Sequence, residues 1–207
     1  TKLKAVYYYD TITQVDGGCR LFEENEGKTL WQLARKVCED YDLDSTMLKR
    51  PEEIREIVDL EGERTFVWQI VRENGEKTWL RTFDDPMDIF PHESEISAAL
   101  KRISSALPKI GFVEGYGMRS IDDFSPRGYS RFTRIKYARL GVINQGFDVE
   151  AVDLNQGIPD DINILTIAEM REPFSETELL TLKNYVERGG NLFILAEPRR
   201  REVMNPL

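Results

Sequence analysis

The second half of the chain alternates short apolar runs with amphipathic ones, and this alternation restricts the possible folds more than any other feature. Runs rich in β-branched and aromatic residues predict strands at 109–113, 147–154, 162–168 and 191–196. A helix is expected from Ser175 to Arg188, between the last two strands. Strands and helices joined by short connections predict an α/β fold with a mainly parallel sheet covered by helices on both faces.

Local signals predict where the helices of this half begin and end. Ser175 and Glu178 form a capping-box pattern, and Gly189 is suited to the left-handed conformation that ends a helix. Pro126 in a first-turn position predicts a second helix over 125–144. A further helix over 93–107 is expected to bridge the two halves of the chain.

The first half has a different pattern and predicts a smaller α+β domain. A strand is expected at Leu3–Tyr9, and a helix follows the capping-box residue Thr29. Pro51 opens a short helix, and Asn74-Gly75 between two β-rich runs predicts a hairpin. We therefore expect an α+β domain at 1–92 and an α/β domain at 93–207 that is truncated at its carboxyl end.

Composition narrows the functional classes. The formal net charge of −9 argues against nucleic acid as a partner, because phosphate contacts need a basic surface. No apolar run reaches the ~18–20 residues that cross a bilayer. The first residue, Thr1, is not a methionine, and we expect the chain to be an excised piece whose membrane anchors are absent from it.

The two cysteines give little direction. No CxxC motif accompanies them, so zinc binding and thioredoxin-like redox chemistry have no support. Cys19 and Cys38 form a disulfide in an oxidising compartment or stay as one loop thiol and one buried helix thiol, and the sequence leaves both alternatives open.

Catalytic residues are missing where an α/β sheet would carry them. Neither cysteine lies beyond position 38, His92 is the only histidine, and no GxSxG motif is present. Gly115 and Gly117 lack the third glycine of a dinucleotide loop, and no acidic pair has metal-ligand spacing. The sequence therefore predicts no catalytic residue, no metal and no cofactor.

Polar residues nevertheless gather where the strands at 109–113 and 162–168 end. Because ligands of parallel sheets bind at the carboxyl ends of the strands, this rim is the candidate ligand-binding site. Salt bridges along the rim are the alternative. The candidate residues are Gly115, Tyr116, Gly117, Arg119, Ser120, Glu169, Arg171 and Glu172.

A basic stretch with no acidic residue runs through the expected helix at 125–144. It is either a solvated face or a docking surface for the acidic N-terminal half, a partner protein or lipid head groups. Its members are Arg127, Arg131, Arg134, Lys136 and Arg139.

Several segments, in order, resemble the GldG-like family of auxiliary components of ABC-type transport systems, which is associated with gliding motility. The resemblance covers about residues 93–207. Its segments are Pro108–Gly117 (PKIGFVEGYG), Asn144–Val149 (NQGFDV), Ile158–Ile162 (IPDDI), Arg171–Glu176 (REPFSE) and Tyr185–Leu192 (YVERGGNL).

The resemblance implies a noncatalytic domain with a class I amidotransferase-like or flavodoxin-like sheet. It also implies a location on the periplasmic face of the cytoplasmic membrane, beside ABC permease and ATPase subunits, through anchors absent from this chain. Where the family often has Gly-His-Gly-Glu, this chain has Gly115-Tyr116-Gly117-Met118. We expect coupling or scaffolding of the transporter, with a small-ligand or glycan-binding module and a hydrolase as alternatives.

Overall fold

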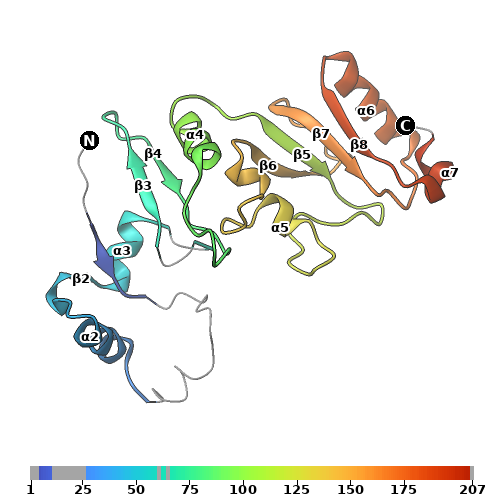
Figure 1. Ribbon diagram of the computed structural model, residues 1–207. Coiled ribbons are helices and arrows are strands. Elements are labelled where there is room, and N and C mark those ends of the chain that lie inside the picture. Colours follow the sequence, from blue (N-terminus) through green and yellow to red (C-terminus); the bar gives the residue numbers. More distant parts are fainter. Residues whose placement is uncertain (1–4, 11–26, 60–61, 64–65, 206–207) are drawn as a thin grey trace. The chain divides into compact units, whose positions relative to one another are not determined.

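The computed structural model describes residues 5–10, 27–59, 62–63 and 66–205 (Figure 1). The contacts divide the chain into two compact units, Thr1–Thr65 and Phe66–Leu207. Each unit is described by itself.

The first unit is small and mixed. Its strands β1 (Tyr7–Tyr8) and β2 (Leu48–Lys49) pair in parallel. Helix α2 (Leu30–Asp40) carries the expected capping box, and α3 (Pro51–Ile57) begins at its proline as predicted. A 3₁₀ turn, Ser45–Met47, precedes β2.

Part of the predicted N-terminal structure lies outside the described residues. Of the expected strand Leu3–Tyr9, the described part forms only the two residues of β1. The polar loop that contains Cys19 is not described, whereas Cys38 is buried on α2. The question of a disulfide between the two cysteines therefore stays open.

The second unit begins with the predicted hairpin. Strands β3 (Trp68–Val71) and β4 (Lys77–Leu80) are antiparallel around Asn74-Gly75. Helix α4 (Glu93–Arg102) packs against β4, and the Arg72 guanidinium donates to the carbonyl of Ile103, at 2.6 Å. Because of these contacts the hairpin belongs to the unit that contains the sheet, whereas the sequence boundary was predicted at 92/93.

A four-stranded parallel sheet, flanked by helices, forms the main part of this unit and confirms the predicted α/β class (Figure 1). The strand order is β6-β5-β7-β8. The strands are β5 (Lys109–Val113), β6 (Asp148–Val152), β7 (Ile162–Ala168) and β8 (Asn191–Leu195).

Helix α6 (Glu176–Glu187) covers one face of the sheet. Its Leu182 and Tyr185 share a buried cluster with Leu165 and Ile167 of β7. The capping box of Ser175 with Glu178 is present as predicted. After β8 the chain forms a 3₁₀ turn at Pro198–Arg200 and the short helix α7 (Arg201–Met204), whose Met204 belongs to the same buried cluster.

The prediction of a helix over 125–144 is wrong. This segment contains the four-residue α5 (Ser130–Thr133), then turns, then a 3₁₀ turn at Val142–Asn144. The Asn144 amide donates to the carbonyls of Lys136 and Ala138, each at 2.9 Å. These side-chain bonds satisfy carbonyls that a helix would otherwise use, and so stabilise the folded-back loop instead.

Candidate ligand-binding rim

The predicted site residues lie at the topological switch point of the sheet. From β5 the chain passes to β6 on one side, and after β6 it returns to β7 on the other side of β5. In parallel sheets the crevice between such strands, at their carboxyl ends, is the usual ligand position. The loops after β5 and β7 carry the eight candidate residues, so the structure brings the two sequence segments to one edge.

Backbone hydrogen bonds join these two loops directly. The carbonyl of Tyr116 accepts from the amides of Arg171 and Glu172, at 2.9 and 3.1 Å. A Cβ added to Gly117 would lie 2.9 Å from the Cβ of Arg171, so the loops approach as closely as a glycine permits. The crevice is therefore closed by the protein's own backbone.

Two non-glycine residues in these loops adopt left-handed conformations. Tyr116 has φ 52° and Glu169 has φ 54°. Such a conformation costs on the order of 1–3 kcal/mol unless the surroundings hold it in place. Both residues directly follow a strand or its first turn, so strain is concentrated at the switch point.

The Tyr116 side chain fastens the first loop to helix α6. Its hydroxyl donates to the carboxylate of Glu178, and its ring packs edge-on against Phe174 with centroids 4.6 Å apart. Burial, which is the larger cause, and this hydrogen bond together raise the pKa of Tyr116 to about 12. The same bond, with the amide of Ser175, lowers the pKa of Glu178.

Other rim side chains are also paired within the rim. Arg119 Nε lies 2.8 Å from a carboxylate oxygen of Glu169, and the guanidinium covers the ring of Tyr129 at 5.7 Å. The Ser120 hydroxyl donates to Glu114, at 2.6 Å. For Arg119 and Glu169 the structure therefore agrees with the alternative prediction, that charged residues of the rim form salt bridges with one another.

The side chains of Arg171 and Glu172 are different. Both residues are exposed and form no ion pair with any residue that the structure describes. Binding of a ligand by the rim stays a prediction.

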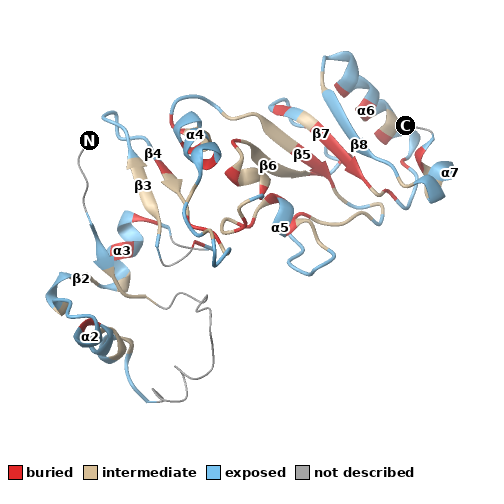
Figure 2. Ribbon diagram, in the orientation of Figure 1, coloured by how far each residue is buried: buried red, intermediate tan, exposed pale blue. Residues whose placement is uncertain are grey.

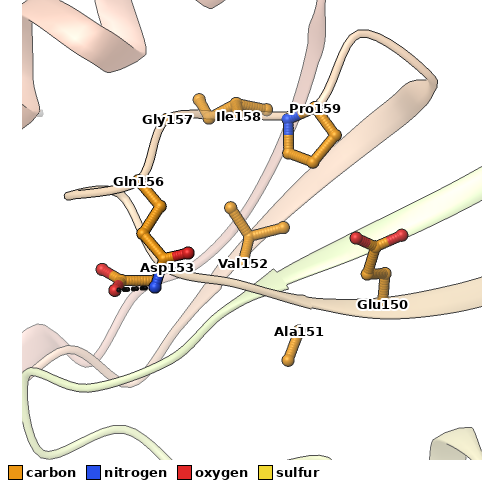
Figure 3. A pocket seen from close by; sticks show the side chains of 8 residues that line it. All are labelled: Glu150, Ala151, Val152, Asp153, Gln156, Gly157, Ile158 and Pro159. Atoms are coloured by element: carbon orange, nitrogen blue, oxygen red, sulfur yellow. Dashed lines mark hydrogen bonds between the residues drawn. The ribbon is translucent and has the colours of Figure 1, made fainter.

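A separate hollow of about 300 Å³ lies beside β6, under the loop that leads to β7 (Figure 3). Its acids are already engaged, because Glu150 binds Lys109 and Asp153 accepts from Gln156. The sequence analysis did not anticipate it. The sequence signal that could have revealed it is the lack of a helix pattern between the strands β6 and β7. The connection that crosses β5 is therefore a loop. The hollow is lined by Glu150, Ala151, Val152, Asp153, Gln156, Gly157, Ile158 and Pro159.

The histidine considered for catalysis lies at the start of a helix. His92 is the N-cap residue of α4, and its Nε2 lies 2.9 Å from an Asp88 oxygen. Within the described ranges, no group of three or more histidine, cysteine or acidic side chains is arranged to hold a metal ion.

Most of the basic stretch is neutralised inside the second unit. Arg131 binds Asp84 at 2.6 Å, and Arg139 binds Glu95 at 2.8 Å. Arg134 binds Asp122. Among the open alternatives, the structure agrees with docking on acids of the first half of the chain, because Arg131 binds Asp84 and Arg139 also lies 3.3 Å from a carboxylate oxygen of Asp88.

An α/β sheet with a self-bonded polar rim is the class of domain that these observations define. Residues 107–206 match the model of a family described as an ABC-type uncharacterized transport system (ABC_transp_aux). This match covers β5 through α7 and supports an auxiliary component of an ABC transport system. The narrower GldG-like resemblance is not part of that match. No curated protein and no solved structure matches the chain. None of the described helices has the length and apolar character needed to cross a membrane.

Proposed function

We propose that this chain is a noncatalytic, extracytoplasmic accessory domain of an ABC-type transporter, similar to the GldG-like family, that couples or scaffolds the permease and ATPase subunits through protein–protein contacts. The observation that carries the proposal is a set of exposed apolar side chains on interconnected loops of the unit that contains the matched sheet. The set consists of Met87, Phe90, Phe132 and Leu140, which are 95, 60, 56 and 78% exposed.

Hydrogen bonds and ion pairs join the loops that carry these four residues. Arg139 Nη2 donates to the carbonyl of Phe90 at 2.9 Å, and Leu140 is the next residue. Arg131, which precedes Phe132, binds Asp84 in the loop that leads to Met87. Apolar surface gathered on ion-paired loops is typical of a site for another protein.

The rim chemistry supports a noncatalytic role. A general base must hold its proton weakly near neutral pH, and Tyr116, with its pKa raised to about 12, does not. The Ser120 hydroxyl donates to a carboxylate and has no imidazole beside it among the described residues. A nucleophile with a matched base is therefore lacking at this rim.

A photoactivatable residue at Leu140 of the full-length protein in its native membrane tests the coupling role. We expect crosslinks to the permease or ATPase subunits from Leu140, and none from Glu73, which is also exposed, in the hairpin turn. Crosslinks to neither subunit from Leu140, or the same products from both positions, would contradict the proposal.

The periplasmic location has a separate test. Glu73→Cys, introduced into the full-length protein, is treated with a membrane-impermeant maleimide in intact spheroplasts. Labelling above the unsubstituted parent is expected before lysis. Labelling that requires lysis would place the domain on the cytoplasmic side and reject the extracytoplasmic assignment.

A small-ligand or glycan-binding module is the second candidate. The exposed charges of Arg171 and Glu172 and the left-handed backbone of Tyr116 and Glu169, at a switch point, favour it. Arg171→Ala should then weaken binding of an anionic ligand, and Arg171→Ala and Glu172→Ala should both weaken binding of a polyhydroxyl ligand, in a screen of nucleotides and oligosaccharides. An array without any binder would remove this candidate.

A further inference from the structure

The loop at 84–92, between β4 and α4, presents apolar side chains to solvent, and most of its residues are exposed (Figure 2). Met87 is 95% exposed and Phe90 is 60% exposed. The Phe90 ring lies against Trp68 of β3, with centroids 5.9 Å apart, and the Trp68 ring meets that of Phe66 at 4.8 Å. The apolar surface of the loop therefore continues onto the hairpin. Aromatic residues and methionine are enriched at protein interfaces.

Hydrogen bonds within the same unit fix the shape of this loop. The amide of Phe83 donates to the carbonyl of Ile89 at 2.9 Å, which closes the loop on itself. The amide of Asp84 donates to the carbonyl of Tyr137 at 3.0 Å, which fastens the loop to the segment after α5. A surface that is already ordered loses less conformational freedom on binding. The 84–92 loop is therefore preorganised for docking.

The same loop and the first turn of α4 are acidic. Residues 84–95 contain five acidic residues and no lysine or arginine. Three of the five are ion-paired with Arg131 or Arg139, at 2.6 to 3.3 Å. These three are Asp84, Asp88 and Glu95. Because two arginines serve three acids, part of the negative charge stays uncompensated even within these pairs.

The other two acids, Asp85 and Glu93, are exposed and form no ion pair with residues that the structure describes. The Asp85 carboxylate accepts a hydrogen bond from the amide of Met87 at 3.0 Å. Glu93 follows Phe90 by three residues and is the first residue of α4. Along the chain, the two exposed apolar residues therefore lie between two uncompensated carboxylates. A partner with basic residues around an apolar centre matches this arrangement, and an acidic partner is repelled by it.

We propose that the 84–92 loop docks on a basic, apolar segment of the permease or ATPase subunit. Apolar side chains of that segment cover Met87 and Phe90, and its lysines or arginines meet Asp85 and Glu93. The inference rests on the proposed coupling role and names the chemistry of the partner surface. Complementary charge at the border of such a contact speeds association and selects against acidic partners.

A photoactivatable residue at Met87 of the full-length protein in its native membrane identifies the partner segment. Crosslinked peptides of the permease or ATPase subunit, sequenced by mass spectrometry, should contain apolar residues and more lysine and arginine than acids. Where Leu140 crosslinks to a subunit, this inference alone is overturned if Met87 yields no crosslink, or crosslinks to lipid, to a second copy of this chain, or to an acidic or neutral segment. If neither position crosslinks to a subunit, the coupling role and this inference fail together.

Charge reversal at two matched positions tests the electrostatic part. Glu93 and Glu176 are the first residues of α4 and α6, and both are exposed and without an ion pair in the described ranges. Glu93→Lys should lower the yield of the Met87 crosslink about fivefold or more, because the new cation repels a basic segment. Glu176→Lys should leave the yield unchanged. Asp85→Asn, which keeps an acceptor for the Met87 amide, should lower it about twofold. A yield indifferent to Glu93→Lys, or reduced equally by Glu176→Lys, overturns the proposal.

Discussion

The switch-point rim and strand β8 are two edges of one sheet with opposite properties. The rim is polar, and its side chains form hydrogen bonds and ion pairs with other residues of the same unit. These side chains are Tyr116, Arg119, Ser120 and Glu169. β8 is apolar, exposed, and unpaired on its outer side within the described structure. A polar edge is therefore not by itself a binding site, because its groups can be satisfied within the same unit.

The largest expected effect separates interior from edge within one register pair. Leu165 on β7 is fully buried, and its partner Leu192 on β8 is 37% exposed. Leu165→Ala should lower the free energy of unfolding by about 3 kcal/mol, and Leu192→Ala by less than about 1 kcal/mol in the monomer, because a cavity forms only at the buried site. Urea unfolding at low protein concentration measures both. Equal losses would mean that β8 is covered within the monomer.

The next effect concerns the close approach of the rim loops. Gly117 has φ +68°, and an added Cβ would meet Arg171 at 2.9 Å. Gly117→Ala should cost about 2–3 kcal/mol, because left-handed strain and a collision act together. Gly157→Ala is the control: its φ is +89° but no atom lies within 4 Å, so only the conformational cost of about 1 kcal/mol is expected. Thermal unfolding that ranks the two variants equally would mean that the loops separate in solution.

A smaller effect follows from the bond between Tyr116 and Glu178. Tyr116→Phe should cost about 1–2 kcal/mol at neutral pH, because it leaves a buried carboxylate oxygen without its donor. The folded-state pKa of Tyr116 is raised, so the wild type should keep this stability below pH 10 and lose it as pH rises towards 12. Unfolding free energies measured from pH 8 upward should converge for the two proteins. Parallel curves would show that the phenol does not titrate as described.

The smallest effect is expected from the half-exposed ion pair. Arg119→Gln removes the bond to Glu169 and should change stability by less than about 1 kcal/mol, with most of that loss disappearing at high salt. Urea unfolding at low and high ionic strength measures the change. A loss well above this, insensitive to salt, would make Arg119 an anchor of the rim fold.

Most of the sheet could be predicted from the sequence. Lys109–Val113 and Ile162–Ala168 were predicted with their observed bounds, because apolar runs between turn residues are strong local signals. The prediction of a helix at 125–144 failed because the Asn144 side chain bonds the carbonyls of Lys136 and Ala138, eight and six residues earlier, and so holds a folded-back loop. The Tyr116–Glu178 bond was not predictable for another reason, since its partners are 62 residues apart. The rim residues were located by topology, but their mutual pairing depends on side-chain positions that no local pattern encodes.

Hydrogen exchange of the 207-residue chain at two protein concentrations compares the two edges directly. The amides of Arg171 and Glu172, which donate to Tyr116, should be protected equally at both concentrations. The amides of β8 that point away from β7 have no partner strand in the described ranges and should exchange faster at both concentrations. Exchange at Arg171 and Glu172 as fast as at these outer β8 amides would contradict a closed rim.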